Sequence, residues 1–149
     1  MIPCFVDSLD PFKIDDFATI FRLARQHVLI EGDKPLTRES LVDAVKTGQS
    51  FVGFDVLGDT TGFRFESVSV FDDGFGSNPN HYGVRVISPL PARIVVFLNG
   101  ERFDEMDGSK SLEMDLSKPG AYRVEVYLDQ LGPPFDKMPW IISKPIYVH

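Results

Sequence analysis

Apolar residues in the first third of the chain recur every three or four positions, which is the spacing of one face of an amphipathic helix. Asp15 or Asp16 can supply the N-cap of a first helix, and Gly32 followed by Pro35 is a signal that ends it. The apolar face of this predicted helix carries Phe17, Ile20, Phe21, Ala24 and Val28.

A second helix is predicted directly after the first. Thr37 is a suitable N-cap for it, and Gly48 is a suitable C-cap. Leu41, Val42 and Val45 form its predicted inner stripe. Both helices are short and neither buries its stripe alone, so we expect the pair to pack against the rest of the chain.

Beyond Gly48 the period changes to two, or to short apolar runs between turn residues, which is typical of β-strands. The alternation is cleanest in the sixth candidate strand, where the even-numbered residues from Tyr122 to Leu128 share one face. The candidate strands are Phe51–Leu57, Phe63–Val70, Val84–Ser88, Ala92–Leu98, Ser111–Leu116, Ala121–Leu128 and Ile141–Val148.

Pairs of turn-forming residues separate these strands. Asn99-Gly100 is the strongest hairpin signal, and Gly58-Asp59, Asp107-Gly108 and Pro119-Gly120 are further predicted turns. About seven short strands at regular spacing predict a mainly β fold, an immunoglobulin-like antiparallel β-sandwich, with an N-terminal helical pair. We therefore divide the chain into an N-terminal helical segment, 1–49, and a β-sandwich, 50–149.

Composition and charge limit the possible partners. The chain has 149 residues, with 15 basic and 22 acidic side chains and a net charge of −7. Such a surface repels phosphates, which argues against nucleic acid and anionic membranes as partners. Cys4 is the only cysteine, so no intramolecular disulfide is possible. With no signal-like segment at the start and no apolar run of membrane-spanning length, we expect a soluble, cytoplasmic protein.

Metal-ligating and nucleophilic motifs are missing from the sequence. His27, His81 and His149 stand at no metal-ligand spacing. Cys4 has no basic neighbour to lower its pKa, and no serine lies in a G-x-S-x-G motif. We therefore predict no catalytic residue and no metal ligand in this chain.

Two polar stretches contain the oxygen-bearing side chains that a cation site requires. Glu101–Asp115 is acidic, but an EF-hand register would place Phe103 and Met114 at ligand positions, so it is interpreted as a solvated turn. Asp72–Tyr82 is rich in Gly, Asn and Asp and is predicted to be a surface loop.

Two runs in the C-terminal third carry a family resemblance. Pro119–Val126 reads PGAYRVEV, and Pro139–Val148 reads PWIISKPIYV. They resemble the end of bacterial metal-dependent phosphoesterases of the polymerase and histidinol phosphatase (PHP) superfamily, in which P-G-x-Y-R-V-E-V is followed by P-W-I-x-S-N-P-I-Y. Leu29–Phe65 and Pro89–Gly100 fit the same group in order and spacing. Lys144 departs from the pattern, which has Asn there.

The resemblance implies a non-catalytic accessory region. The PHP catalytic module carries H-x-H and further His and Asp metal ligands, all upstream of the region matched here. This chain has none of them, and Val6–Asp10 supplies Asp without His. The expected role is to cover or orient a PHP catalytic module, in cis or in trans. Metal ions would then belong to that module, with no cofactor in this chain and no catalysis by the chain alone.

Residues inside the resembling runs also have a structural interpretation. Tyr122, just after a Pro-Gly turn, suits a tyrosine corner. Trp140 is large enough to plug one end of the sandwich, and Pro145 restricts its strand to an edge or a bulge. With Arg123, Glu125 and Tyr147 they form the motif of the resemblance, which we interpret as structural.

Two other functions remain open. One is a stand-alone binding module for a carbohydrate or a protein. The other is an independent hydrolase, which the lack of an acid, base and metal constellation disfavours. Phe17, Ile20, Phe21 and Ala24 are a possible interface with the catalytic module, or with a second copy in a homo-oligomer through the N-terminal helix. The alternative is that this stripe packs wholly on the sandwich.

Overall fold

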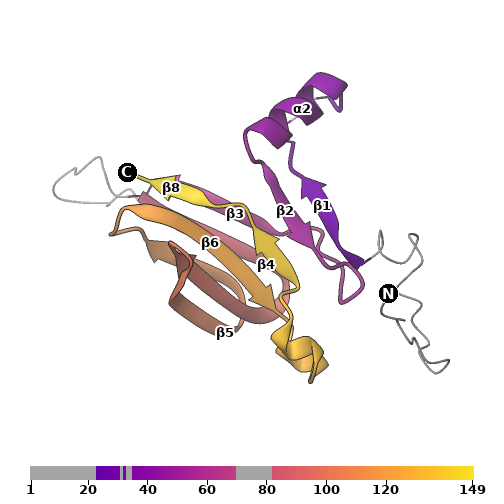
Figure 1. Cartoon of the computed structure of the whole chain (residues 1–149), viewed down its shortest axis with the longest axis vertical. Coiled ribbons are helices and arrows are strands. Elements are labelled where there is room, and N and C mark those ends of the chain that lie inside the picture. The colour runs from indigo at the N-terminus through magenta and orange to yellow at the C-terminus, as the bar shows by residue number, and fades with distance from the viewer. Residues whose placement is uncertain (1–22, 31, 33–34, 70–81) are drawn as a thin grey trace, which may run out of the picture.

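Eight antiparallel strands form one curled sheet in the computed structural model, which describes residues 23–30, 32, 35–69 and 82–149 (Figure 1). Their order is β1-β2-β7-β6-β4-β3, with β5 also on β4 and β8 also on β6. The prediction of a mainly β fold is therefore confirmed. The strands are β1 (Arg25–Val28), β2 (Ser50–Gly53), β3 (Arg64–Ser69), β4 (Tyr82–Leu98), β5 (Glu101–Asp115), β6 (Gly120–Tyr127), β7 (Ile141–Ser143) and β8 (Ile146–Val148).

The long strand β4 is the reason that the sheet curls. Its first part, 83–87, pairs with β3 and with the end of β5, whereas 93–98 pairs with β6 and with the start of β5. The register with β5 shifts between Ile87 and Ala92. Pro89 and Pro91 lie in this interval and cannot donate backbone hydrogen bonds to a ladder, so the strand bends there. Two predicted strands, Val84–Ser88 and Ala92–Leu98, are thus one bent strand.

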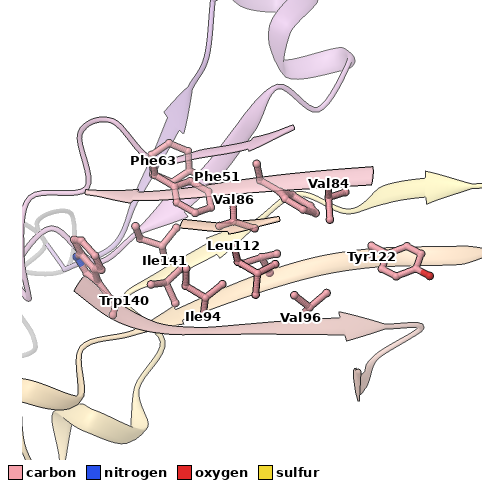
Figure 2. Close-up of a cluster of buried hydrophobic side chains, with 14 of the residues drawn as sticks. Phe51, Phe63, Val84, Val86, Ile94, Val96, Leu112, Tyr122, Trp140 and Ile141 are labelled. Carbon is pink, nitrogen blue, oxygen red and sulfur yellow. The ribbon is translucent and has the colours of Figure 1, made fainter. Parts of the chain in front are cut away.

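The core lies on the inner face of the curl, where side chains from different parts of the same sheet meet (Figure 2). The alternation predicted for β6 is confirmed, because every second residue from Tyr122 to Leu128 is buried. Phe51 and Phe63 pack edge to face with ring centroids 5.0 Å apart. The larger fully buried side chains include Trp140, Tyr122, Phe63, Ile94, Leu128 and Ile141.

The helix α2 (Arg38–Lys46) begins as the sequence predicts. Thr37 is its N-cap and accepts a hydrogen bond from the Ser40 backbone N–H. Thr47 is the C-cap, and Gly48 follows it with φ +70°, so Gly48 lies one position beyond the predicted cap. The predicted inner stripe is wrong: Leu41, Val42 and Val45 are 41%, 43% and 48% exposed, and Ala44 is the buried residue. The helix stands beyond the ends of β1 and β2, where little of its surface meets the sheet (Figure 1).

The first predicted helix does not extend to Val28. Arg25–Val28 is strand β1, which pairs with β2 so that His27 lies opposite Phe51. Ala24 is exposed and outside any helix. Backbone pairing with β2 and stacking of the His27 ring on Phe51 outweigh the helical spacing of the apolar residues. Phe17, Ile20 and Phe21 lie outside the described residues, as does most of the predicted loop at 72–82.

One predicted turn and one predicted strand differ in the structure. Asp107-Gly108 is not a turn between two strands but lies inside β5, where Gly108 has φ +62° beside a register irregularity. The predicted last strand is divided into β7 and β8 at Lys144-Pro145, since Pro145 cannot continue the ladder. Asn99-Gly100 does form the hairpin turn, with φ of +53° and +90°.

The described residues include no helix with the length and apolarity needed to cross a bilayer.

The two remaining elements are single 3₁₀ turns. They are η1 (Asp129–Leu131) and η2 (Phe135–Lys137), and they connect β6 to β7. They place Trp140 directly before β7, where its backbone N–H donates to the Val126 carbonyl.

Candidate functional site

Four described strands, β1, β3, β5 and β8, pair with one neighbour each, and the open edge of β3 is the one that borders the main hollow. Among the described strands, β3 pairs with β4 alone, so its other edge has no strand neighbour. This edge borders a hollow of about 650 Å³. The hollow is lined by the C-terminal end of α2 and the residues after it, the middle of β3, the β7–β8 connection and β8, namely Lys46, Thr47, Gly48, Phe65, Glu66, Ser67, Lys144, Pro145, Ile146 and Tyr147.

Further hollows continue along the same edge. One of about 460 Å³ includes Arg64, Gln49 and Lys144, and one of about 340 Å³ includes Ser67 and His149. A smaller one of about 200 Å³ reaches His27 and Arg64. Each contains at least one residue of Arg64–Ser67. We call this chain of hollows the β3 groove.

The walls of the β3 groove combine apolar and cationic groups. Phe65 is buried beneath it, and Tyr147 is 66% exposed beside it. Lys46 and Lys144 both line it, and neither has an ion-pair partner among the described residues. In a chain of net charge −7, two such lysines at one groove form a local positive site.

A polar cluster lies near one end of the groove. The Nε2 atom of His27 is 3.1 and 3.2 Å from the two carboxylate oxygens of Asp55. The Thr60 hydroxyl donates to Asp55 at 2.5 Å and lies 3.1 Å from the same Nε2. Arg25 adds an ion pair to Asp55 at 3.7 Å. We call His27, Asp55 and Thr60 the His27 cluster.

The His27 cluster has the residue types of a catalytic triad without its geometry. In a triad the acid and the nucleophile use different nitrogens of the histidine ring. Here Asp55 and Thr60 share Nε2, and the Thr60 hydroxyl, fully buried, is committed to Asp55. The cluster therefore links β1 to the 55–60 connection through polar contacts. Within the described part of the chain, no three His, Cys, Asp or Glu side chains gather as a metal-ligand group.

The motif residues named from the sequence are spread over the fold. Tyr122 is fully buried, and its hydroxyl donates to the Lys118 carbonyl at 2.8 Å, which is the hydrogen bond expected of a tyrosine corner. Trp140 is fully buried in the core. Arg123 and Glu125 form an ion pair at 2.7 Å on the outer face of β6.

Only Pro145 and Tyr147 of that motif line the β3 groove. The groove itself had no sequence signal, because it results from which strand edge remains open after the sheet curls. Lys46 stands near the end of the second predicted helix and Lys144 inside the last predicted strand, so neither position marked a shared site.

The outer face of β4 and β6 holds a network around Tyr127. The Arg93 guanidinium lies 4.4 Å from the Tyr127 ring centroid and donates to Asp129 at 2.8–3.1 Å. The Tyr127 hydroxyl donates to Glu125. Burial, and then the hydrogen bond and negative charge of Glu125, raise the pKa of Tyr127 to about 12.

This pKa shift predicts a stability change at alkaline pH. The folded state favours the neutral phenol, so the contribution of Tyr127 is complete below pH 10 and is lost as pH rises from 10 to about 12. We expect ultraviolet titration to show a tyrosine component that ionises late, and Tyr127→Phe to reduce that component. Loss of an early component instead would contradict the assignment.

Comparisons with protein-family models, with curated protein sequences and with solved structures give no match to this chain.

Proposed function

We propose that this chain is a non-catalytic accessory domain that binds an extended segment of a partner protein in the β3 groove. The observation that carries the proposal is the free edge of β3, which lines every hollow of the groove. An unpaired strand edge offers backbone donors and acceptors, and an extended peptide can pair with them as an added strand. The hollows that border this edge would then accept side chains of that peptide.

The positive charge of the β3 groove favours some partner segments over others. Lys46 and Lys144 favour an acidic side chain or a terminal carboxylate at the α2 end. Tyr147, 66% exposed, offers an amphipathic ring beside them. The preferred segment is therefore extended, apolar at alternate positions and acidic at one end.

The fold class belongs to the same proposal. We propose an immunoglobulin-like β-sandwich whose two layers are the two parts of the curled sheet. The hydrogen bond from Tyr122 to the Lys118 carbonyl supports this class, since a tyrosine corner is typical of such sandwiches. The bend of β4 between Ile87 and Ala92, which lets one strand serve both layers, supports it as well.

Peptide selection followed by nuclear magnetic resonance tests the groove. Random peptides displayed on phage are selected on the whole chain, and a selected peptide is titrated into it. We expect amide shifts to concentrate in Arg64–Ser69 and in 144–148. Lys144→Glu should weaken binding by about two- to fivefold, and Lys110→Glu, a matched exposed lysine outside the groove, should not. Shifts confined to other strands would overturn the proposed site.

The partner proposed from the sequence resemblance is a PHP catalytic module. When such a module from a bacterial phosphoesterase is titrated into the chain, we expect the amide signals of the same residues to shift. The chain itself, assayed with manganese and an aryl phosphate, is expected to release no phosphate. If peptides bind but the module does not, the β3 groove stands as a peptide-binding site and the proposed PHP partner is wrong. Shifts on adding oligosaccharides instead would favour the carbohydrate-binding alternative.

A further inference from the structure

Three residues on the core face of the sheet lack the cover that their neighbours have. Ser67 lies opposite the fully buried Val84, and directly opposite side chains share a face, so Ser67 points to the core side. The same argument places Ile146, opposite the fully buried Tyr122, and Val148, two positions further, on the core face. Nevertheless Ser67 is exposed, and Ile146 and Val148 are only half-buried. The hydrophobic core is therefore incomplete at this point.

The same three residues line one hollow of the β3 groove, which has a volume of about 340 Å³. Leu116, which is 7% exposed, lines it as well, and Tyr147 and His149 complete its wall. A cavity of about 150 Å³ is enough to hold a benzene ring. This hollow, which we call the Ser67 hollow, therefore has room for an aromatic or a large aliphatic side chain.

We propose that the segment bound in the β3 groove inserts one aromatic or large aliphatic side chain, its anchor, into the Ser67 hollow, and carries an acidic side chain two positions away, towards Arg64. This inference rests on the proposed function, because it needs a strand added along β3. Alternate residues of such a strand share a face, so the residue opposite Ser67 points to the core side. There it covers Ile146 and Val148 and completes the core.

The charge of the groove places the acidic side chain. Lys144 lines both hollows that include Phe65 and Glu66, and Lys46 lines one of them. Phe65 is on the core face, so a residue of the added strand opposite Phe65 points the same way as the anchor and lies two positions from it. Glu66 points to the other face and is in an ion pair within β3 at 3.5 Å. Neither lysine has an acidic partner among the described residues, and a carboxylate at this position supplies one.

Synthetic peptides titrated into the whole chain test both positions. The probe is the acetylated and amidated peptide TVTETFTVT, in which Glu and Phe share a face, and the reversed sequence TVTFTETVT covers the opposite strand direction. We expect one of the two to shift the amide signals of Arg64–Ser69. The ring current of its Phe should also shift the methyl signals of Leu116, Ile146 and Val148. Replacing that Phe by Ala should weaken binding about tenfold, and replacing Glu by Gln about two- to fivefold.

A variant of the chain tests the anchor from the other side. Val148→Thr keeps the size of the side chain but adds a hydroxyl to the Ser67 hollow, so the advantage of the Phe peptide over its Ala version should fall to about threefold. Val52→Thr makes the same change at a 36% exposed valine outside the groove and should leave the tenfold advantage unchanged. An equal effect of the two variants would contradict the anchor.

The outcomes distinguish this inference from the proposed function. If the peptides shift Arg64–Ser69 but the Phe and Ala versions bind equally, the β3 groove stands as the binding site and the anchor is wrong. If neither probe shifts any signal at concentrations up to about 1 mM, the anchor and its acidic neighbour are wrong. The proposed function itself fails on a different result, which is that phage-selected peptides shift only strands other than β3.

Discussion

Replacement of Trp140 by alanine should lower the free energy of unfolding by about 3–5 kcal/mol, because a fully buried indole leaves a large cavity. The side chain is fully buried, and its Nε1–H donates to the Gly58 carbonyl at 2.8 Å. Removing the ring also leaves that carbonyl without its donor. Urea unfolding followed by circular dichroism measures the change.

Trp140→Phe is the matched variant. It keeps an aromatic ring in the core but lacks the Nε1–H donor. Trp140→Phe should therefore lower the free energy of unfolding by clearly less than Trp140→Ala does. A loss of less than about 1 kcal/mol for Trp140→Ala would show that the ring is not a core residue.

Gly53→Ala is the second substitution with a large expected effect. A Cβ at Gly53 would lie 2.8 Å from the Thr60 Oγ1, 2.9 Å from its Cγ2 and 3.2 Å from the His27 Cδ2. Thr60 is fully buried and bonded to Asp55, so it cannot move away without breaking the His27 cluster. We expect the free energy of unfolding to fall by about 1–3 kcal/mol, as for other overpacked sites.

The control for this variant is Val52→Ala, the adjacent position on β2. Val52 is 36% exposed, so its truncation should cost less than the added methyl group at Gly53. Equal stability of Gly53→Ala and the unmodified chain would mean that the His27 cluster is loosely packed. The imidazole proton signals of His27 should shift in Gly53→Ala and stay in place in Val52→Ala.

The sheet was predictable where one face of a strand is buried. In β6 the alternation from Tyr122 to Leu128 sets which residues face the core, and a slip of one residue would expose all of them. The Asn99-Gly100 turn was equally clear, because residues with positive φ are needed there. The union of two predicted strands in β4 was not predictable, since Pro89 and Pro91 read as a break between strands.

The helical region shows the limit of periodicity. Leu41, Val42 and Val45 have the spacing of a buried face, but spacing does not state what covers that face. At 25–28 the decisive interaction is with β2, more than twenty residues along the chain, which a local pattern does not contain.

The candidate site depended on the same long-range information. Lys46 and Lys144 are almost a hundred positions apart, and only the folded sheet brings both to the β3 groove. His27 falls within the first predicted helix and stands at no metal-ligand spacing, so its contacts with Asp55 and Thr60 could not be foreseen.

The bent strand β4 has a consequence for folding. Because its 17 residues belong to both parts of the curled sheet, neither part has a complete set of strand neighbours without the other. A nucleus must bring together β3, β4 and β6, which are separated by long stretches of chain, so folding should be slow for a chain of this length. Unfolding should likewise be a single cooperative event, and the amide protons along β4 should exchange with solvent only when the whole sheet opens.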